Sequence, residues 1–303
     1  MARPEPNQLD FFVVDAIDFR AKHVLDLMQR NLFSLSKKKR LEPILHEEKG
    51  SFIKVTGDDD YGIANVFDQD LLIFLISVMV DQKNKGEKVK RAIGFTGYEF
   101  WKFTGKKPRS GMSGRSYEEL WSSMERLHHT HVETDIRSKG NRRNHKFTWL
   151  REIDQMWVEE ERDDEGRLIK KGRHYGFSAV VPEWLHEAVD KEKPWVLTLN
   201  HLYFKITSPI ERWLYLYARK SAGKQELGWQ ESIDSLYEKS GSISAKDQFE
   251  RSVRNILSKR ENRVLEYEIK REDTIGRSVK RGLRFTRSKY LPKEQQRTLL
   301  TYE

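Results

Sequence analysis

One stretch of the sequence, residues 244–260, pairs an apolar helix stripe with side chains that suit DNA base edges. Its apolar residues recur at the spacing of one helix face: Phe249, Val253, Ile256 and Leu257. The opposite face carries cationic, amide and hydroxyl groups, with Asp247 as the acidic residue against them: Gln248, Arg251, Arg254, Asn255, Ser258 and Lys259. Arginine pairs bidentately with guanine, and asparagine or glutamine with adenine, so this face predicts contacts in a major groove. A solvated helix surface is the alternative.

A second set of residues would suit DNA nicking. His129 and His131 are separated by one residue, and Tyr217 is followed three positions later by Lys220. Two such histidines can hold a metal ion that positions a scissile phosphate, which a tyrosine then attacks. However, these histidines fall where a helix is expected to end and a strand to begin, and Tyr217 lies on the apolar side of its helix. We therefore keep a rolling-circle tyrosine nickase as the weaker alternative and expect no catalytic residue and no metal site.

The composition bounds the classes of partner. The chain has 303 residues, of which 37% are hydrophobic and 11% aromatic, enough for two folded domains. Its net charge of +9 favours an anionic partner, either nucleic acid or an anionic membrane surface. The absence of cysteine excludes disulfides and thiolate metal sites and fits a reducing cytosol, so we expect a cytoplasmic protein. No phosphate-loop motif of the form G-x-x-x-x-G-K-[ST] occurs, and we expect no cofactor.

No segment indicates export or membrane insertion. The first ten residues lack a basic segment followed by an apolar run, so we expect no secretory signal. The longest apolar run, residues 71–80, is about half the length that spans a bilayer and is flanked by Asp70 and Asp81. It predicts a buried core helix and no membrane partner.

The elements of the first half follow the order of a winged helix. We expect three helices and then a hairpin: helices at 67–83, 97–105 and 116–129, and strands at 132–136 and 146–150. Residues 1–64 predict an extended N-terminal arm with one helix and a short strand at 52–55. Residues 158–181 read as strand, acidic turn and strand, followed by a helix near 183–188. This segment is either an enlarged hairpin or the joint between domains.

The same order returns downstream. A helix at 208–223 begins with Ser208 as N-cap and Pro209 at its first position, and a second helix at 231–241 stops at Gly241. The opening stretch is the third helix, and residues 264–270 and 282–287 form a hairpin. A shift of 132 positions places four apolar residues of the first half, Tyr117, Trp121, Met124 and Val132, on Phe249, Val253, Ile256 and Val264.

The pattern therefore predicts an α+β protein with two winged-helix domains in tandem. We expect an arm at 1–64, a first domain at 65–200, a second domain at 201–290 and a tail at 291–303. The third helix of the first domain, at 116–129, carries three carboxylates on its polar face: Glu118, Glu119 and Glu125. DNA phosphates would therefore repel this helix. Both hairpins have basic tips that predict phosphate or minor-groove contact, with a solvated turn as the alternative: Arg137, Lys139, Arg142, Arg143 and Lys146 in the first, and Arg277, Lys280, Arg281 and Arg284 in the second.

With these elements placed, the chain resembles the replication initiator protein A family of plasmids and phages. The resemblance runs from about residue 8 to residue 287 and rests on the order of several segments: "QLDFF" at 8–12, "NLFSLSKKK" at 31–39, "FDQDLLIFLIS" at 67–77, "SYEELWSSMERL" at 116–127, "SPIERWLYLYARKSAG" at 208–223 and "LYEKSGS" at 236–242.

The resemblance implies binding of duplex DNA at an origin, commonly at repeated sites, with opening of the duplex and delivery of host initiator and helicase. It also implies that the second winged helix makes the main sequence-specific contacts, while the first adds contacts or a homodimer surface. By position, Arg251, Arg254 and Asn255 would enter the major groove and the hairpin around Lys280 would lie on the backbone. A transcriptional repressor with the same DNA contacts is the alternative, because such initiators often repress their own promoters.

Overall fold

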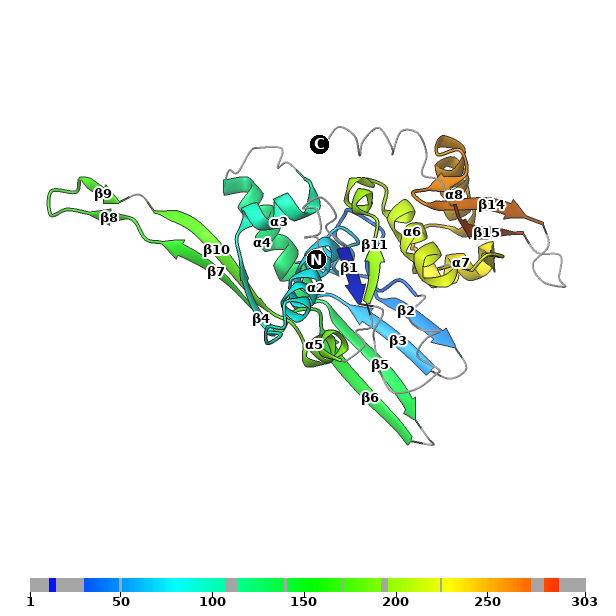
Figure 1. Ribbon diagram of the computed structural model, residues 1–303, viewed down its shortest axis with the longest axis horizontal. Coiled ribbons are helices and arrows are strands. Elements are labelled where there is room, and N and C mark those ends of the chain that lie inside the picture. Colours follow the sequence, from blue (N-terminus) through cyan, green and yellow to red (C-terminus); the bar gives the residue numbers. More distant parts are fainter. Residues whose placement is uncertain are drawn as a thin grey trace, which may run out of the picture.

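The computed structural model describes residues 11–14, 30–48, 51–106, 114–138, 141–170, 172–191, 196–223, 225–273 and 281–288. These residues form an α+β fold of helices and antiparallel sheets (Figure 1). It has two hydrophobic cores: the first lies in the first half, and the second lies in the second half and also takes in Ile73 of the first.

Helix α2 (Gln69–Asn84) lies at the centre of the first half. The side chains of Leu71 to Ser77 are all buried, as the apolar run predicts for a core helix. Helices α3 (Gly97–Thr104) and α5 (Glu183–Asp190) pack against it. No helix within the described ranges is long and apolar enough to cross a membrane.

The main sheet of the first half has the strand order β2, β3, β5, β6: Ile44–Glu48, Ser51–Thr56, His131–Ser138 and Asn141–Thr148. Helix α4 (Gly114–His129) leads into β5, so three helices precede a hairpin in the expected order. The described part of the predicted arm, residues 30–48 and 51–64, does not extend away from this body, because Leu32, Ile44 and Ile53 are buried in the first core. Buried and exposed residues alternate along β3, which is why one of its faces can join that core.

A second sheet of the first half extends into a ribbon. Strands β4 (Ala92–Phe95), β10 (Arg173–Val180) and β7 (Glu152–Val158) pair in that order, and β8 (Glu161–Arg162) and β9 (Leu168–Lys170) pair near the tip. Figure 1 shows this ribbon projecting away from the body of the molecule. Of the two alternatives for residues 158–181, the structure therefore has the enlarged hairpin.

The second half repeats the order of helices and hairpin. After β11 (Val196–Leu199), which pairs with β1 (Phe11–Val14), come the short helix η1 (His201–Lys205) and helices α6, α7 and α8: Pro209–Ser221, Ile233–Ser240 and Lys246–Lys259. Its sheet has the order β12, β15, β14, β13: Trp229–Ser232, Gly282–Arg287, Tyr267–Glu272 and Arg263–Val264. The backbone N–H of Glu211 donates to the Ser208 hydroxyl, and Gly241 ends α7 with a φ of 60°. Both helix boundaries were predicted.

The two third helices are not related by the predicted shift of 132 positions. Helix α4 buries Leu120, Met124 and Leu127, whereas α8 buries Phe249, Val253 and Leu257. Leu120 and Met124 lie 129 positions before Phe249 and Val253, and Tyr117 and Trp121 are only half-buried. Apolar residues cover a wide face of α4, so the sequence of α4 can be aligned with that of α8 at more than one shift. The two halves therefore share the order of their helices and strands, and not a residue-by-residue match at a shift of 132.

Candidate nucleic-acid interface

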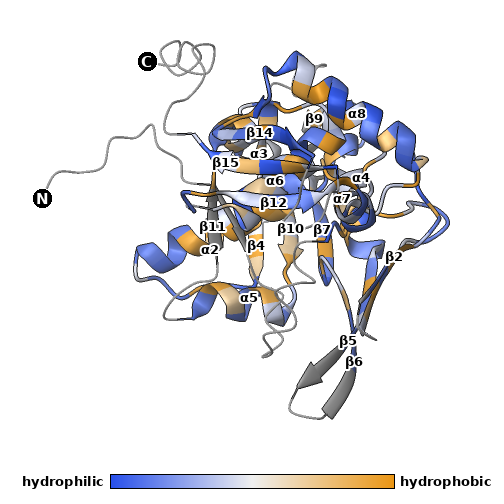
Figure 2. Cartoon of the chain, turned by 90° about the vertical axis from the view of Figure 1, so that its right-hand side faces the viewer, coloured by the Kyte–Doolittle hydropathy of each residue, from blue (hydrophilic) through white to orange (hydrophobic). Residues whose placement is uncertain are grey.

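Helix α8 lies at the edge of the second half, with hydrophilic and hydrophobic residues alternating along it (Figure 2). Phe249, Val253 and Leu257 hold it against the core, and none is more than 2% exposed. The predicted base-reading side chains all lie on its exposed side: Gln248, Arg251, Arg254, Asn255, Ser258 and Lys259. The structure thus gathers these six residues on one accessible helix surface.

The predicted polar face of α8 included Asp247 as its acidic residue and did not include Glu250. The side chain of Glu250 is 16% exposed, and its Oε1 accepts hydrogen bonds from Arg254 Nη2 at 3.0 Å and Arg281 Nη1 at 3.3 Å. The spacing of Glu250 and Arg254 is a sequence signal for the first contact, because residues four apart are neighbours on a helix. The contact with Arg281 depends on how the hairpin folds back onto α8, so local sequence could not reveal it.

The second hairpin presents its arginines differently. The side chain of Arg281 is 75% exposed, while its carbonyl accepts a hydrogen bond from Ile233 N, which fixes the hairpin stem to the start of α7. Arg284 is turned along the sheet, where it donates to Glu272 Oε1 at 2.5 Å and to the Leu227 carbonyl at 3.1 Å. Arg277 and Lys280 lie outside the described residues.

In the first hairpin, the strand register sets Arg137 opposite Arg142 and Ile136 opposite Arg143. The side chains of these residues, and Lys139 altogether, lie outside the described part of the structure. Lys146 is exposed and its Nζ lies 3.2 Å from Glu133 Oε2.

The polar face of α4 differs from that of α8. Glu118 and Glu119 are exposed, and Arg115 Nε lies 3.6 Å from Glu119 Oε1. Arg126 turns inward instead, where its Nε and Nη2 donate to the two oxygens of Asp68 at 2.8 and 2.7 Å. The exposed carboxylates would be repelled by phosphate, and the inward arginine is already paired.

The geometry opposes tyrosine-dependent nicking. His129 Nδ1 and Nε2 lie 2.6 Å from Asp58 and 3.3 Å from Glu125, at the junction of α4 and β5 that the sequence predicted. Tyr217 is 3% exposed in the second core and donates to Glu231 Oε2 at 2.6 Å. Burial and, secondarily, the Glu231 carboxylate raise the pKa of Tyr217 far above its usual range. A nucleophile must be reachable and able to lose its proton, and Tyr217 meets neither condition here.

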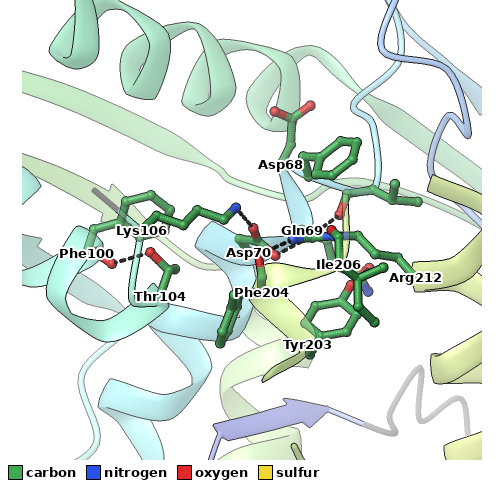
Figure 3. A network of polar contacts seen from close by, with 12 residues as sticks. Asp68, Gln69, Asp70, Phe100, Thr104, Lys106, Tyr203, Phe204, Ile206 and Arg212 are labelled. Carbon is green, nitrogen blue, oxygen red and sulfur yellow. Dashed lines mark hydrogen bonds and ion pairs between the residues drawn. The ribbon is translucent and has the colours of Figure 1, made fainter. Parts of the chain in front are cut away.

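A buried ion pair joins the two halves (Figure 3). The side chains of Arg212 on α6 and Asp70 on α2 are both 0% exposed, with Arg212 Nη1 2.6 Å from Asp70 Oδ1. Arg212 also donates to the carbonyls of Ile206 and Phe204, and Lys106 contacts the second Asp70 oxygen. Such a buried charge is tolerated only when it is fully paired, so this network fixes α6 against α2.

A second contact between the halves caps the C-terminus of α7. Asn31 donates from its backbone to the Lys239 carbonyl and from its side chain to the Ser240 carbonyl, and Arg40 Nη1 donates to the Gly241 carbonyl at 2.6 Å. The last carbonyls of a helix have no partner within it, so residues from the first half supply one here. A Cβ on Gly241 would lie 2.8 Å from Ile44 Cγ2, which shows how closely the two halves approach.

His46 lies within this contact. Its Nε2 is 2.9 Å from the Asn31 carbonyl. Burial lowers the pKa of His46 to about 4, against the hydrogen bond to Asn31, and the charges of Arg30 and Arg40 lower it further. The neutral imidazole is therefore the form that fits the joint between the halves.

Comparison with known proteins gives a consistent result. Residues 22–269 match the family model described as replication initiator protein A. A protein of Wigglesworthia glossinidia brevipalpis described as "Putative replication protein" is 32% identical over 265 residues, covering 86% of this chain and 89% of that protein.

Two crystal structures of domains 2 and 3 of RctB have a similar fold. One aligns with a TM-score of 0.59 at 12% identity over 85% of this chain and 95% of its own. The other aligns with a TM-score of 0.53 at 14% identity over 87% of this chain and 96% of its own. At these identities the likeness concerns the fold alone.

Proposed function

The chain belongs to the replication initiator protein A family, and from that premise we propose that it binds duplex DNA at a replication origin through the exposed face of α8. Each half acts as a winged helix. The second half reads the sequence, and the first adds contacts to the DNA backbone or a surface for a second copy. Binding at repeated sites opens the duplex without covalent catalysis and delivers the host initiator and helicase.

The observation that carries this proposal is the composition and exposure of one helix face. Arg251, Arg254 and Asn255 are exposed on α8, while Phe249 and Val253 fix the helix beneath them. Arginine and asparagine side chains match guanine and adenine edges, and a helix fits the width of the major groove. Helix α4 offers carboxylates at the corresponding place, so the same role in the first half is disfavoured.

Origin opening in this proposal draws on binding energy. A protein that bends or untwists DNA transfers part of its contact energy into deformation of the duplex, and flexible base steps deform most easily. Two halves held firmly together suit that task, because a rigid body can impose its own geometry on the duplex. The Asp70–Arg212 pair and the cap on α7 supply this rigidity.

Two experiments test the proposal. A footprint of the purified protein on the DNA that flanks its gene should show protected, repeated segments. The gene with this flanking DNA should then support replication of a circle that lacks any other origin. Absence of a protected segment would contradict origin binding, and protection without replication would leave transcriptional repression as the function.

A further inference from the structure

The Glu250 carboxylate lies among the cations of the candidate interface. Its Oε1 bonds Arg254 of α8 and Arg281 of the hairpin stem, at 3.0 and 3.3 Å. Its side chain is 16% exposed, whereas those of Arg254 and Arg281 are 49% and 75% exposed. One partly buried acid thus holds two accessible guanidinium groups that come from different elements.

The surroundings of Glu250 keep this arrangement in place. The Ile233 N–H donates to the Arg281 carbonyl at 3.0 Å, and Lys246 in the first turn of α8 pairs with Asp234 in the first turn of α7. The hairpin stem, α7 and α8 are therefore tied to one another around Glu250. Charge-assisted hydrogen bonds to one oxygen restrict the directions in which both guanidinium groups can point.

A carboxylate at this place affects the two kinds of DNA contact unequally. Phosphates are anionic, so a carboxylate within a Debye length of about 8 Å weakens every phosphate contact that its arginines make. Guanine O6 and N7 are neutral acceptors, so base-edge contacts suffer much less from the same charge. Non-specific binding rests almost wholly on phosphates, and it therefore carries most of the penalty.

We propose that Glu250 is a specificity-determining positioning residue: it orients Arg254 and Arg281 and suppresses binding to DNA that offers phosphates alone. This inference rests on the proposed function and assigns a role to a residue that would itself touch no base. The face of α8 owes its selectivity to the acid beneath it as well as to its arginines.

The test compares Glu250→Gln, which keeps the shape and removes the charge, with the wild-type full chain on the footprinted site and on random duplex, over a series of salt concentrations. Glu250→Gln should bind random duplex up to about eightfold more tightly near 0.1 M salt, which is the effect of one more phosphate contact. The slope of log affinity against log salt concentration should steepen by about one unit. Affinity for the site should change less, so that the ratio of specific to random affinity falls.

Two further variants separate this role from general effects. Glu187→Gln on the exposed side of α5 makes the same change in net charge far along the chain and should leave the affinity ratio as it is. Glu250→Asp keeps the charge on a shorter side chain, so it should retain the salt slope of the wild type while lowering the ratio. It also tests the proposal if Glu250→Gln fails to fold.

The outcomes are distinct. An affinity ratio for folded Glu250→Gln equal to that of the wild type, or a loss matched by Glu187→Gln, would overturn the role of Glu250. If Glu250→Gln does not fold, an unchanged ratio in Glu250→Asp has the same meaning. A wild-type protein that prefers no sequence over random duplex would instead overturn the proposed function itself.

Discussion

Helices α4 and α8 stand at the same place in the order of their halves, and each pairs an arginine with an acid. Arg126 on α4 grips Asp68 in a bidentate pair whose acid is 3% exposed. Arg254 on α8 meets Glu250 four residues earlier and keeps half of its side chain in solvent. A pair of guanidinium and carboxylate groups therefore holds the fold together at α4, whereas at α8 the guanidinium group remains available to a partner. Burial, rather than residue type, separates the two roles.

The largest effect is expected when the pair between Arg126 of α4 and Asp68 is broken. Arg126→Ala leaves the Asp68 carboxylate buried without its main cation, which should lower the free energy of unfolding by about 3 kcal/mol. Denaturant unfolding measures this loss. Arg115→Ala on the exposed face of the same helix is the control and should cost less than about 0.5 kcal/mol. Equal losses from the two variants would contradict the distinction drawn from burial.

The next effect concerns His46, in the contact where residues of the first half cap the C-terminus of α7. The pKa of His46 is lowered to about 4 in the folded protein from its ordinary 6.5, so the unfolded chain binds more protons between these values. The stability that follows from keeping His46 neutral is therefore fully present above pH 6.5. As the pH drops towards 4, the free energy of unfolding should fall by about 2 to 3 kcal/mol.

Urea unfolding at several pH values measures this slope. His46→Gln removes the titrating group and should flatten the dependence within that window, although the variant is less stable throughout. An unchanged slope in His46→Gln would place the pH dependence elsewhere.

On α8 the arginine should matter for binding instead of folding. Arg254→Ala should cost about 1 to 3 kcal/mol at the footprinted site and relax the preference for one base pair. Its effect on unfolding should stay below about 1 kcal/mol, since Arg254 is half exposed and Glu250 keeps Arg281 as a second partner. Titrations with the site, with single-base variants of it and with random duplex measure these effects. Equal losses on specific and random DNA would contradict base reading.

The smallest effect belongs to the first hairpin. Lys146→Ala should weaken binding to all sequences alike, by less than about 1 kcal/mol, and lower the salt slope by about one unit, as loss of one phosphate contact does. Lys85→Ala, at the exposed end of α2, is the matched control and should change neither quantity. A change in sequence preference for Lys146→Ala would show that the first half also reads bases.

Local patterns in the sequence predicted the helices, helix ends and strands that depend on residues close together in the chain. The apolar run at 71–80 gave the central helix, and Ser208 and Gly241 marked helix ends because capping involves residues only a few positions away. A hairpin with its second strand at 282–287 was predicted correctly, but its first strand is 267–272, because the chain turns at Leu265 between β13 and β14.

Contacts between distant residues were beyond such patterns. On a helical wheel Arg126 belongs to the polar face, and only the fold brings Asp68, 58 positions away, into its reach. The contact between Glu250 and Arg281 spans 31 positions and likewise depends on the hairpin. Residues 30–64 looked like an arm because their partners, β5 and α7, come much later in the chain.

The cap that Asn31 and Arg40 place on α7 bears on how such proteins exchange parts during evolution. If only residues 201–288 were transferred by recombination into a related chain that lacks Asn31 and Arg40, the end of α7 would lose the donors that satisfy it. The unit that can be inherited intact includes residues 30–46 and Asp70, the buried partner of Arg212, together with the second half. A new DNA specificity would therefore spread more readily by substitution on the outer face of α8 than by exchange of whole halves.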